Sequence, residues 1–305
     1  MAETGGFLFA TFKGESLSNG EQVYFGVSRD GLKWGALNGA EPILTSEIGE
    51  CGVRDPFIIR SNDGSKFWLL GTDLRVYTDR DWTRAVREGS RSILIWESSD
   101  LVNWSTPRLV ALAPSDAGCA WAPECVYDVQ RDEYLVFWAS TTCSDDFQKH
   151  RIWASRTNDF VRFSEPTIYI ERSNAVIDTT IVHERGRYYR FSKDESIKTI
   201  AAQSSEDLDG PWTELPTPDL AELRGYEGPQ AFVLKPGVGE GPATWCLLLD
   251  QYAISAGYQP FVTRDLSGGR FESGGGFSFP FKFRHGSVIP ITAEELRRLE
   301  AKWGR

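Results

Sequence analysis

The stretch VRDPFIIRSNDGSKFWLLGTD, residues 53–73, places an Arg-Asp-Pro step before an apolar run, and a second apolar run follows a polar turn. Similar steps open three later segments, WAPECVYD (121–128), VIDTTIVHE (176–184) and EGPQAFVLK (227–235). Self-similarity that recurs along a chain indicates a repeat architecture. The pattern therefore predicts a chain built from related β-sheet units.

A second pattern consists of a Ser or Thr, an acidic turn and then an aromatic residue, and each copy follows an alternating apolar run. Its copies are SRDGLKW (28–34), SSDLVNW (98–104), SRTNDFVRF (155–163), SSEDLDGPW (204–212) and TRDLSGGRF (263–271). A polar turn of this kind between two alternating runs indicates a hairpin. The copies start 70, 57, 49 and 59 residues apart, close to the length of a four-stranded propeller blade with variable loops.

Three apolar runs precede each of the last four copies, but only GFLFATFK and QVYFGVS precede the first. The missing run stands near the other end of the chain as HGSVIPIT (285–292). A strand from this segment would complete the first blade and close the ring, which protects sheet edges. The sequence thus predicts one all-β domain over residues 1–305, a five-bladed β-propeller closed by a C-terminal innermost strand. A short helix is expected at about 292–303, where Thr292 and Glu295 fit a capping box.

Composition limits the classes of partner. The formal net charge is -10, which argues against nucleic acid or an anionic membrane because their phosphates would repel the surface. The 11 Trp, 18 Phe and 10 Tyr residues are explained mainly by sheet packing, although some are candidates for stacking against sugar rings.

The N-terminal sequence MAETGGFLF lacks a basic region and a long apolar run, so we expect no signal peptide or membrane span. A cytoplasmic location and a secreted or periplasmic one with the leader removed both stay open. The five cysteines show no Cys-x-x-Cys spacing. Cys119 and Cys125 are near enough in sequence to pair, but buried free thiols are the favoured interpretation.

Residues at or just before the innermost strands are expected to meet at one mouth of the central channel. In chain order they are Asp55, Trp121, Asp178, Glu227 and His285. A lone Asp-Pro usually marks a surface charge, but repeated placement at one point of a blade is not expected of independent charges. Converging carboxylates desolvate and repel one another, which separates their pKa values and provides one acid and one base. Two opposed carboxylates are the minimum for cleaving a glycosidic bond.

Taken in order, Asp-Pro, Trp-Ala-Pro-Glu, Ile-Asp and Glu-Gly-Pro at the second to fifth innermost strands resemble glycoside hydrolase family 43. The resemblance covers essentially the whole chain. That family comprises inverting arabinofuranosidases, xylosidases, arabinanases and related enzymes. The resemblance implies that Asp55 is the general base, that Asp178 orients and tunes the acid, and that Glu227 is the general acid.

The arginine before Asp55 and the segment FRHGSVIPI resemble a branch associated with arabinofuranosidase and, in some members, galactofuranosidase activity. We therefore expect an exo-acting α-L-arabinofuranosidase whose substrates are plant polysaccharide side chains or oligosaccharides. A pocket closed by loops such as residues 75–91 would favour exo action. A β-D-galactofuranosidase or β-xylosidase of the same family stays open, as does a non-catalytic carbohydrate-binding propeller.

Further residues are candidates for binding. Trp121 is a sugar-stacking wall or a core residue, Arg54 and Arg284 either bind hydroxyls or balance the acidic cluster, and Gln251 is a candidate hydroxyl contact. The resemblance implies that His285 contacts a hydrated calcium or other ion, although no cofactor is required for the chemistry. His150 and His183 are assigned structural roles.

Overall fold

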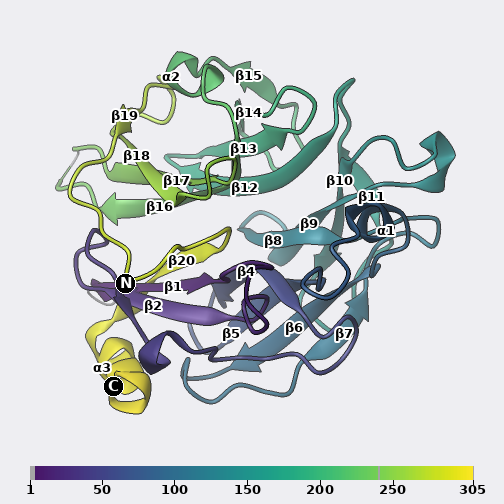
Figure 1. The fold of residues 1–305 in the computed structure, drawn as a ribbon. Coiled ribbons are helices and arrows are strands. Elements are labelled where there is room, and N and C mark those ends of the chain that lie inside the picture. Colours follow the sequence, from purple (N-terminus) through teal and green to yellow (C-terminus); the bar gives the residue numbers. More distant parts are fainter. Residues whose placement is uncertain (1–3, 240, 305) are drawn as a thin grey trace.

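The computed structural model describes residues 4–239 and 241–304, which form five four-stranded antiparallel sheets (Figure 1). The prediction of a five-bladed β-propeller is confirmed. The first blade contains, in order across the sheet, β20 (Ser287–Thr292), β1 (Thr4–Thr11), β2 (Tyr24–Ser28) and β3 (Gly35–Ala36). The second contains β4 (Val53–Arg60), β5 (Phe67–Asp73), β6 (Ser92–Ser98) and β7 (Arg108–Ala111).

The remaining three blades are continuous in sequence. The third contains β8 (Trp121–Asp128), β9 (Glu133–Ser140), β10 (Arg151–Thr157) and β11 (Thr167–Ile170). The fourth contains β12 (Val176–Glu184), β13 (Arg187–Asp194), β14 (Thr199–Ser205) and β15 (Thr213–Leu215). The fifth contains β16 (Tyr226–Lys235), β17 (Thr244–Gln251), β18 (Gly257–Thr263) and β19 (Glu272–Ser273).

The strands β20, β4, β8, β12 and β16 contact one another in that order around the axis, and β16 contacts β20 again. The blade that contains both ends of the described chain therefore lies between the second and fifth blades. Within it, β20 pairs antiparallel with β1, with Leu8 opposite Ile289. The innermost strands bring five sequence-distant segments to one axis.

The Ser/Thr-acid-aromatic repeat forms the turn between the third and fourth strands of each blade. In the second blade, the hydroxyl oxygen of Ser98 accepts hydrogen bonds from the backbone N–H groups of Asp100 and Leu101, at 3.1 and 2.9 Å. The Asp100 carboxylate accepts from the N–H groups of Val102 and Asn103. These side chains satisfy backbone donors that the turn would otherwise leave unpaired, which explains why the pattern recurs.

The hydrophobic core consists of layers between adjacent blades. In one layer, Trp68 of β5 stacks on Phe160, with ring centroids 4.3 Å apart, and packs in one cluster with the fully buried Trp138 of β9. Residues of neighbouring blades thus share one core, so each blade depends on the next for burial of its apolar face.

Helices are few. They are α1 (Trp82–Arg87), α2 (Pro218–Ala221) and α3 (Ala293–Trp303), with 3₁₀ turns η1 (Asn38–Ala40) and η2 (Cys143–Asp145). Thr292 and Glu295 form a capping box at the start of α3, and Arg60 pairs with Glu295 at 2.6 Å, which ties this helix to β4. No helix within residues 4–239 and 241–304 is long and apolar enough to cross a membrane.

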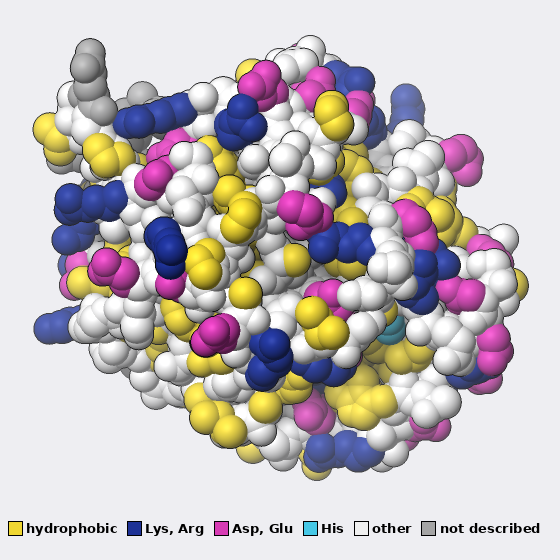
Figure 2. Space-filling view, turned by 90° about the horizontal axis from the view of Figure 1, so that it is seen from above, with side chains coloured by type: hydrophobic (Ala, Val, Ile, Leu, Met, Phe, Trp, Pro, Cys, Tyr) yellow, Lys and Arg dark blue, Asp and Glu magenta, His cyan; other side chains and the backbone are white. Residues whose placement is uncertain are grey.

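The surface carries charges of both signs, and the cysteines are free thiols. Figure 2 shows basic and acidic side chains interspersed over the face it presents. Cys119 and Cys125 are buried free thiols, so the pairing considered from sequence is not formed, and Cys51, Cys143 and Cys246 are free as well.

Candidate functional site

Four of the five innermost segments begin with the same local distortion. The residues Asp55, Ala122, Asp178 and Gly228 have φ values of 49°, 48°, 50° and 55°, and each coincides with a register shift between the first and second strands of its blade. Left-handed backbone costs a non-glycine residue about 1–2 kcal/mol, so it persists where surrounding structure imposes it. Each bulge turns the backbone at the same end of the channel.

The candidate site residues predicted from the sequence occupy two adjacent positions at these bulges rather than one. Asp55 and Asp178 are the left-handed residues themselves, whereas Trp121 and Glu227 each lie one residue earlier, before Ala122 and Gly228. The expectation of one equivalent position in every blade is therefore wrong in detail. The bulges still direct both kinds of residue to one place, because a bulge bends its strand and changes the direction of the side chains beside it.

His285 is the centre of the resulting cluster. It is buried, and its Nδ1 atom lies 3.4 Å from Asp55 Oδ1 and 3.9 Å from Asp178 Oδ1. Burial alone would lower the pKa of His285, but the charges of Asp178, Asp55 and Glu124 outweigh it and raise the pKa to about 10. The imidazole is thus a cation that faces both aspartates.

Asp55 is held by neutral and charged partners. Its Oδ2 atom accepts a hydrogen bond from Thr72 Oγ1 at 2.8 Å, and that hydroxyl oxygen accepts one from the backbone N–H of Ala122, also at 2.8 Å. Burial favours the neutral acid, but the hydrogen bond and charge of His285, with the charge of Arg54, outweigh it and hold the pKa of Asp55 below its ordinary value. Asp55 is consequently an ionised carboxylate at neutral pH.

Asp178 has the opposite electrostatic character. Its Oδ2 atom accepts a hydrogen bond from the backbone N–H of Gly228 at 3.0 Å. Burial, reinforced by the negative charge of Glu227, outweighs the attraction of His285 and raises the pKa of Asp178 to about 6. Environment thus separates the pKa values of two aspartates that share one histidine.

Glu227 lies beside this pair and has two cationic partners. Its Oε2 atom is 2.9 Å from Lys193 Nζ, and its Oε1 atom is 3.2 Å from Arg284 Nη2. Arg284 is fixed in turn by Asp250, whose Oδ2 atom lies 2.5 Å from Arg284 Nε and accepts from the backbone N–H of His285. The Glu227 side chain is 21 % exposed, so among the three carboxylates it is the most accessible to solvent.

Three of the expected binding residues have other contacts. The guanidinium of Arg54 donates to Glu15 and Glu21 at 3.0 and 2.9 Å, so its charge is neutralised beside the cluster. The side-chain amide of Gln251 bonds to the backbone at Arg224 and Ala253, which braces the turn after β17.

Trp121 packs against a small apolar cluster formed by Leu74, Val76 and Ala85 of α1. Its ring centroid lies 5.1 Å from that of His150, whose backbone oxygen also accepts a bond from Val176. Trp121 therefore packs against the 74–91 segment, in keeping with the interpretation of this residue as part of the core.

Four residues of the cluster were not singled out from the sequence. They are Thr72, Glu124, Lys193 and Asp250. Three of them lie on the second strand of a blade, opposite the bulge of the first strand. For those three the only sequence signal was a polar residue near the end of an apolar run, as in GTD, FSKD and LLLDQ, whereas Glu124 is the last residue of the Trp-Ala-Pro-Glu motif.

Glu124 lies on β8, two residues after the left-handed Ala122, and is 3 % exposed. Burial raises its pKa to about 8, against the opposing charge of His285 and a hydrogen bond with Thr180. Glu124 is therefore a neutral acid beneath the charged cluster.

The donor set does not fit a cage for the ion expected near His285. Within the described ranges, no group of three or more His, Cys, Asp or Glu side chains is arranged to hold a metal. Nδ1 of His285 faces Asp55 and Asp178 instead. We therefore derive no step through a metal.

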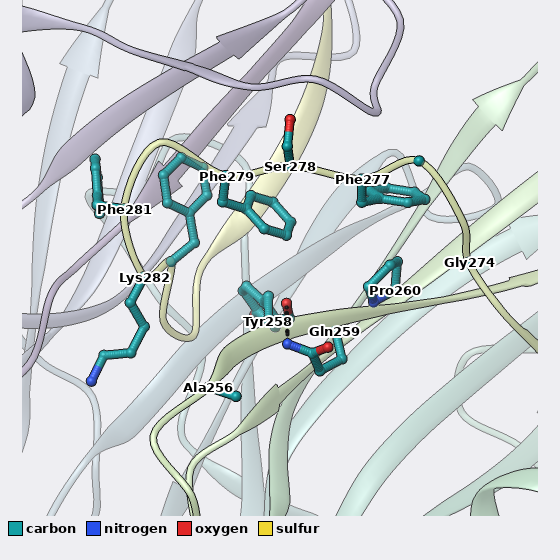
Figure 3. Close-up of a pocket in the computed structure, with 12 residues that line it drawn as sticks. Ala256, Tyr258, Gln259, Pro260, Gly274, Phe277, Ser278, Phe279, Phe281 and Lys282 are labelled. Atoms are coloured by element: carbon teal, nitrogen blue, oxygen red, sulfur yellow. Dashed lines mark hydrogen bonds between the residues drawn. The ribbon is translucent and has the colours of Figure 1, made fainter.

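A cavity of about 440 Å³ lies between β18 and the segment 274–283, and none of the sequence-predicted site residues lines it (Figure 3). Tyr258 connects it to the cluster, because its hydroxyl donates to the carbonyl of Gly228 at 2.8 Å and accepts from the N–H of Gly286 at 2.9 Å. This tyrosine fixes the backbone on both sides of the axis, next to Glu227 and next to His285.

Comparison with known proteins identifies related chains. A family model described as "Probable glycosyl hydrolase domain" matches residues 3–297. An alpha-L-arabinofuranosidase of Bifidobacterium longum subsp. longum is 29% identical over 244 residues, covering 70% of this chain and 23% of that protein. This chain thus spans about a quarter of the length of that curated relative.

Two solved structures share the fold. An exo-beta-1,3-galactanase from Phanerochaete chrysosporium matches with a TM-score of 0.51 and 13% identity, over 72% of this chain and 49% of that one. The catalytic domain of a GH62 alpha-L-arabinofuranosidase from Coprinopsis cinerea matches with a TM-score of 0.51 and 9% identity, over 73% and 67%. At these identities the likeness shows the fold alone.

Proposed function

The chain belongs to glycoside hydrolase family 43, in the group whose family model describes a probable glycosyl hydrolase domain, and we propose that it is an inverting, exo-acting α-L-arabinofuranosidase. The observation that carries the proposal is the cluster of Asp55, Asp178 and Glu227 around His285 at one end of the innermost strands. Identity to an alpha-L-arabinofuranosidase supports arabinofuranose as the sugar. The proposed substrates are arabinose-bearing polysaccharide side chains or oligosaccharides.

In this proposal Asp55 is the general base. Its ionised carboxylate can accept a proton from water as that water attacks the anomeric carbon. Thr72 and His285 each contact one oxygen of Asp55, so the carboxylate is oriented before the substrate arrives. A fixed orientation reduces the entropy lost in reaching the transition state.

Glu227 is the general acid, and its protonated form requires release from one cation. Arg284 is the partner that can be exchanged, because its Nε atom stays anchored on Asp250 while Nη2 makes the longer contact to Glu227. A sugar hydroxyl that draws Nη2 away would free Oε1 to take a proton from solvent, which Glu227 then donates to the departing glycosidic oxygen. Asp178 acts through Gly228, since its bond to that N–H fixes the backbone next to Glu227.

A panel of 4-nitrophenyl α-L-arabinofuranoside, β-D-galactofuranoside and β-D-xyloside tests the proposal. We expect the arabinofuranoside to be hydrolysed fastest, and ¹H NMR to show the β-anomer of arabinose as the first product. Faster hydrolysis of another glycoside would overturn the sugar assignment, whereas an α-anomer formed first would overturn the inverting mechanism.

A further inference from the structure

The segment between β5 and β6 carries a short helix, α1, whose first residue is unusually exposed for its type. Trp82 is 43% exposed, although its ring also has defined partners. Its centroid lies 6.2 Å from that of Trp121 at an interplanar angle of 84°, and 5.1 Å from the guanidinium carbon of Arg54. Trp82 therefore lies above the starts of β4 and β8.

The surrounding segment is held in place. The guanidinium of Arg84 makes two bonds of 2.9 Å to the carboxylate of Glu50, which also accepts from the N–H of Ser90. Asp81 caps the helix by accepting from the N–H of Arg84. Arg87 bonds to Asp146, so α1 is attached to the third blade as well, beside which it lies in Figure 1. A ring on such a support is fixed before any ligand binds.

The ring order of the blades locates Trp82 relative to the acid. In a ring of five, the position opposite one blade is the gap between two others. Glu227 belongs to β16 of the fifth blade, and the gap opposite lies between β4 and β8. Trp82 contacts a residue at the start of each of those two strands, so it stands across the axis from Glu227.

This placement has a chemical consequence if Glu227 protonates the departing oxygen. The leaving group then departs on the Glu227 side, while the attacking water comes from the face of the ring beside Asp55. A further sugar on the glycone would extend away from the leaving group, toward the gap between β4 and β8 at which Trp82 stands. We propose that Trp82 is a wall that blocks this position and thereby restricts the enzyme to single terminal sugars. The inference rests on the proposed function and adds the residue that determines exo action.

Two substrates that differ only in the glycone test the wall. One is 4-nitrophenyl α-L-arabinofuranoside, and the other carries α-1,5-linked arabinobiose on the same nitrophenol. The parent protein should release only arabinose and nitrophenol from both. Trp82→Ala should release intact arabinobiose from the second substrate, with the ratio of arabinobiose to arabinose rising at least tenfold, as measured by anion-exchange chromatography.

On the first substrate, Trp82→Ala should lower kcat/KM only by roughly 3- to 10-fold, the range expected for loss of one aromatic contact. Trp82→Phe is the matched control, because a ring at this position should keep the arabinose-only product pattern. Should Trp82→Ala fail to fold, Glu50→Gln keeps the tryptophan but removes the ion pair to Arg84, and it should also produce arabinobiose.

The outcomes separate the wall from the proposed function. If the parent hydrolyses a different glycoside of the panel, the sugar assignment fails, and the same comparison is made with mono- and disaccharide glycosides of that sugar. A parent that releases the disaccharide, or a Trp82→Ala protein with the parental product ratio, overturns the wall alone. If the parent hydrolyses nothing in the panel, the proposed function fails and the wall fails with it.

Discussion

The α-carbon of Gly228 packs against the imidazole of His285 so closely that a Cβ atom at residue 228 would lie 2.5 Å from the ring. The same glycine has a φ of 55° and donates its N–H to Asp178. The Glu-Gly-Pro step therefore needs glycine for two reasons, backbone conformation and space for the histidine, while the N–H of the same residue joins Asp178 to the strand of Glu227.

Gly228→Ala should destabilise the protein and reduce activity, because the methyl group must displace His285 from Asp55 and Asp178. The matched control is Gly64→Ala, since Gly64 has a φ of 75° but no heavy atom within 4 Å of an added Cβ. The control should lose about 1 kcal/mol of unfolding free energy from backbone strain, and Gly228→Ala should lose more. Urea denaturation of both variants measures this, and equal losses would mean that the histidine contact is unimportant.

Glu227→Ala should lose activity according to the leaving group. On arabino-oligosaccharides, whose leaving oxygen needs a proton, the loss should be about 10²–10⁴-fold. On 4-nitrophenyl arabinofuranoside the loss should be much smaller, because nitrophenolate departs with little assistance. Steady-state kcat/KM on both substrates provides the measurement, and an equal loss on the two would show that Glu227 is not the acid.

Asp55→Ala should lose about 10²–10⁴-fold on both kinds of substrate, since water must be activated whichever group departs. Asp55→Asn tests the charge separately, because it keeps the size of the side chain and a possible bond to Thr72. Both variants should be comparably inactive under the same kinetic assay. Activity of Asp55→Asn close to that of the parent would exclude Asp55 as the base.

Stability should fall as pH rises from about 4.5 to about 8, in part because of Glu124. Its pKa is 4.5 in an ordinary environment and about 8 in the fold, so within this window the folded state binds more protons than the unfolded chain. Each pH unit then lowers the unfolding free energy by about 1.4 kcal/mol. Glu124→Gln removes this contribution and should gain stability relative to the parent as pH rises.

Urea midpoints at pH 5, 6.5 and 8 for the parent and Glu124→Gln measure the difference. His285 acts in both proteins, and its stabilising charge is present below pH 6.5 and lost as pH rises through about 10. The difference between the two proteins therefore reports Glu124 together with its interaction with His285. Identical slopes would mean that Glu124 is ionised in the fold.

The five-bladed fold was predictable because its turns are encoded locally. Ser98 and Asp100 bond to backbone groups within a few residues, so the same short pattern reappears in every blade. The strand starts at Asp55 and Glu227 could be located for the same reason, since each bulge has a proline or glycine as a neighbour in sequence, whereas Asp178 is followed by Thr179 and was located by its place in the repeat.

The partners of those residues were not predictable in the same way. Lys193 and Asp250 contact Glu227 and Arg284 across the boundaries between neighbouring blades, each at a separation of 34 residues, and no local pattern specifies which residues meet there. The contacts of Arg54 were not predictable either, because its guanidinium is held by Glu15 and Glu21, which lie in a loop of another blade. Local chemistry determines which residues begin a strand, whereas tertiary pairing determines what they contact.

The joining of β20 to β1 also sets the order in which the protein can mature during synthesis. Residues 285–292 are the last of the five innermost segments to be made, and they carry His285, which contacts Asp55 at a separation of 230 residues. A nascent chain that has already formed the second to fifth blades still lacks both the innermost strand of the first blade and the cation between the two aspartates. Closure of the ring and completion of the charged cluster are therefore one event, so the cluster cannot be complete before the ring is closed.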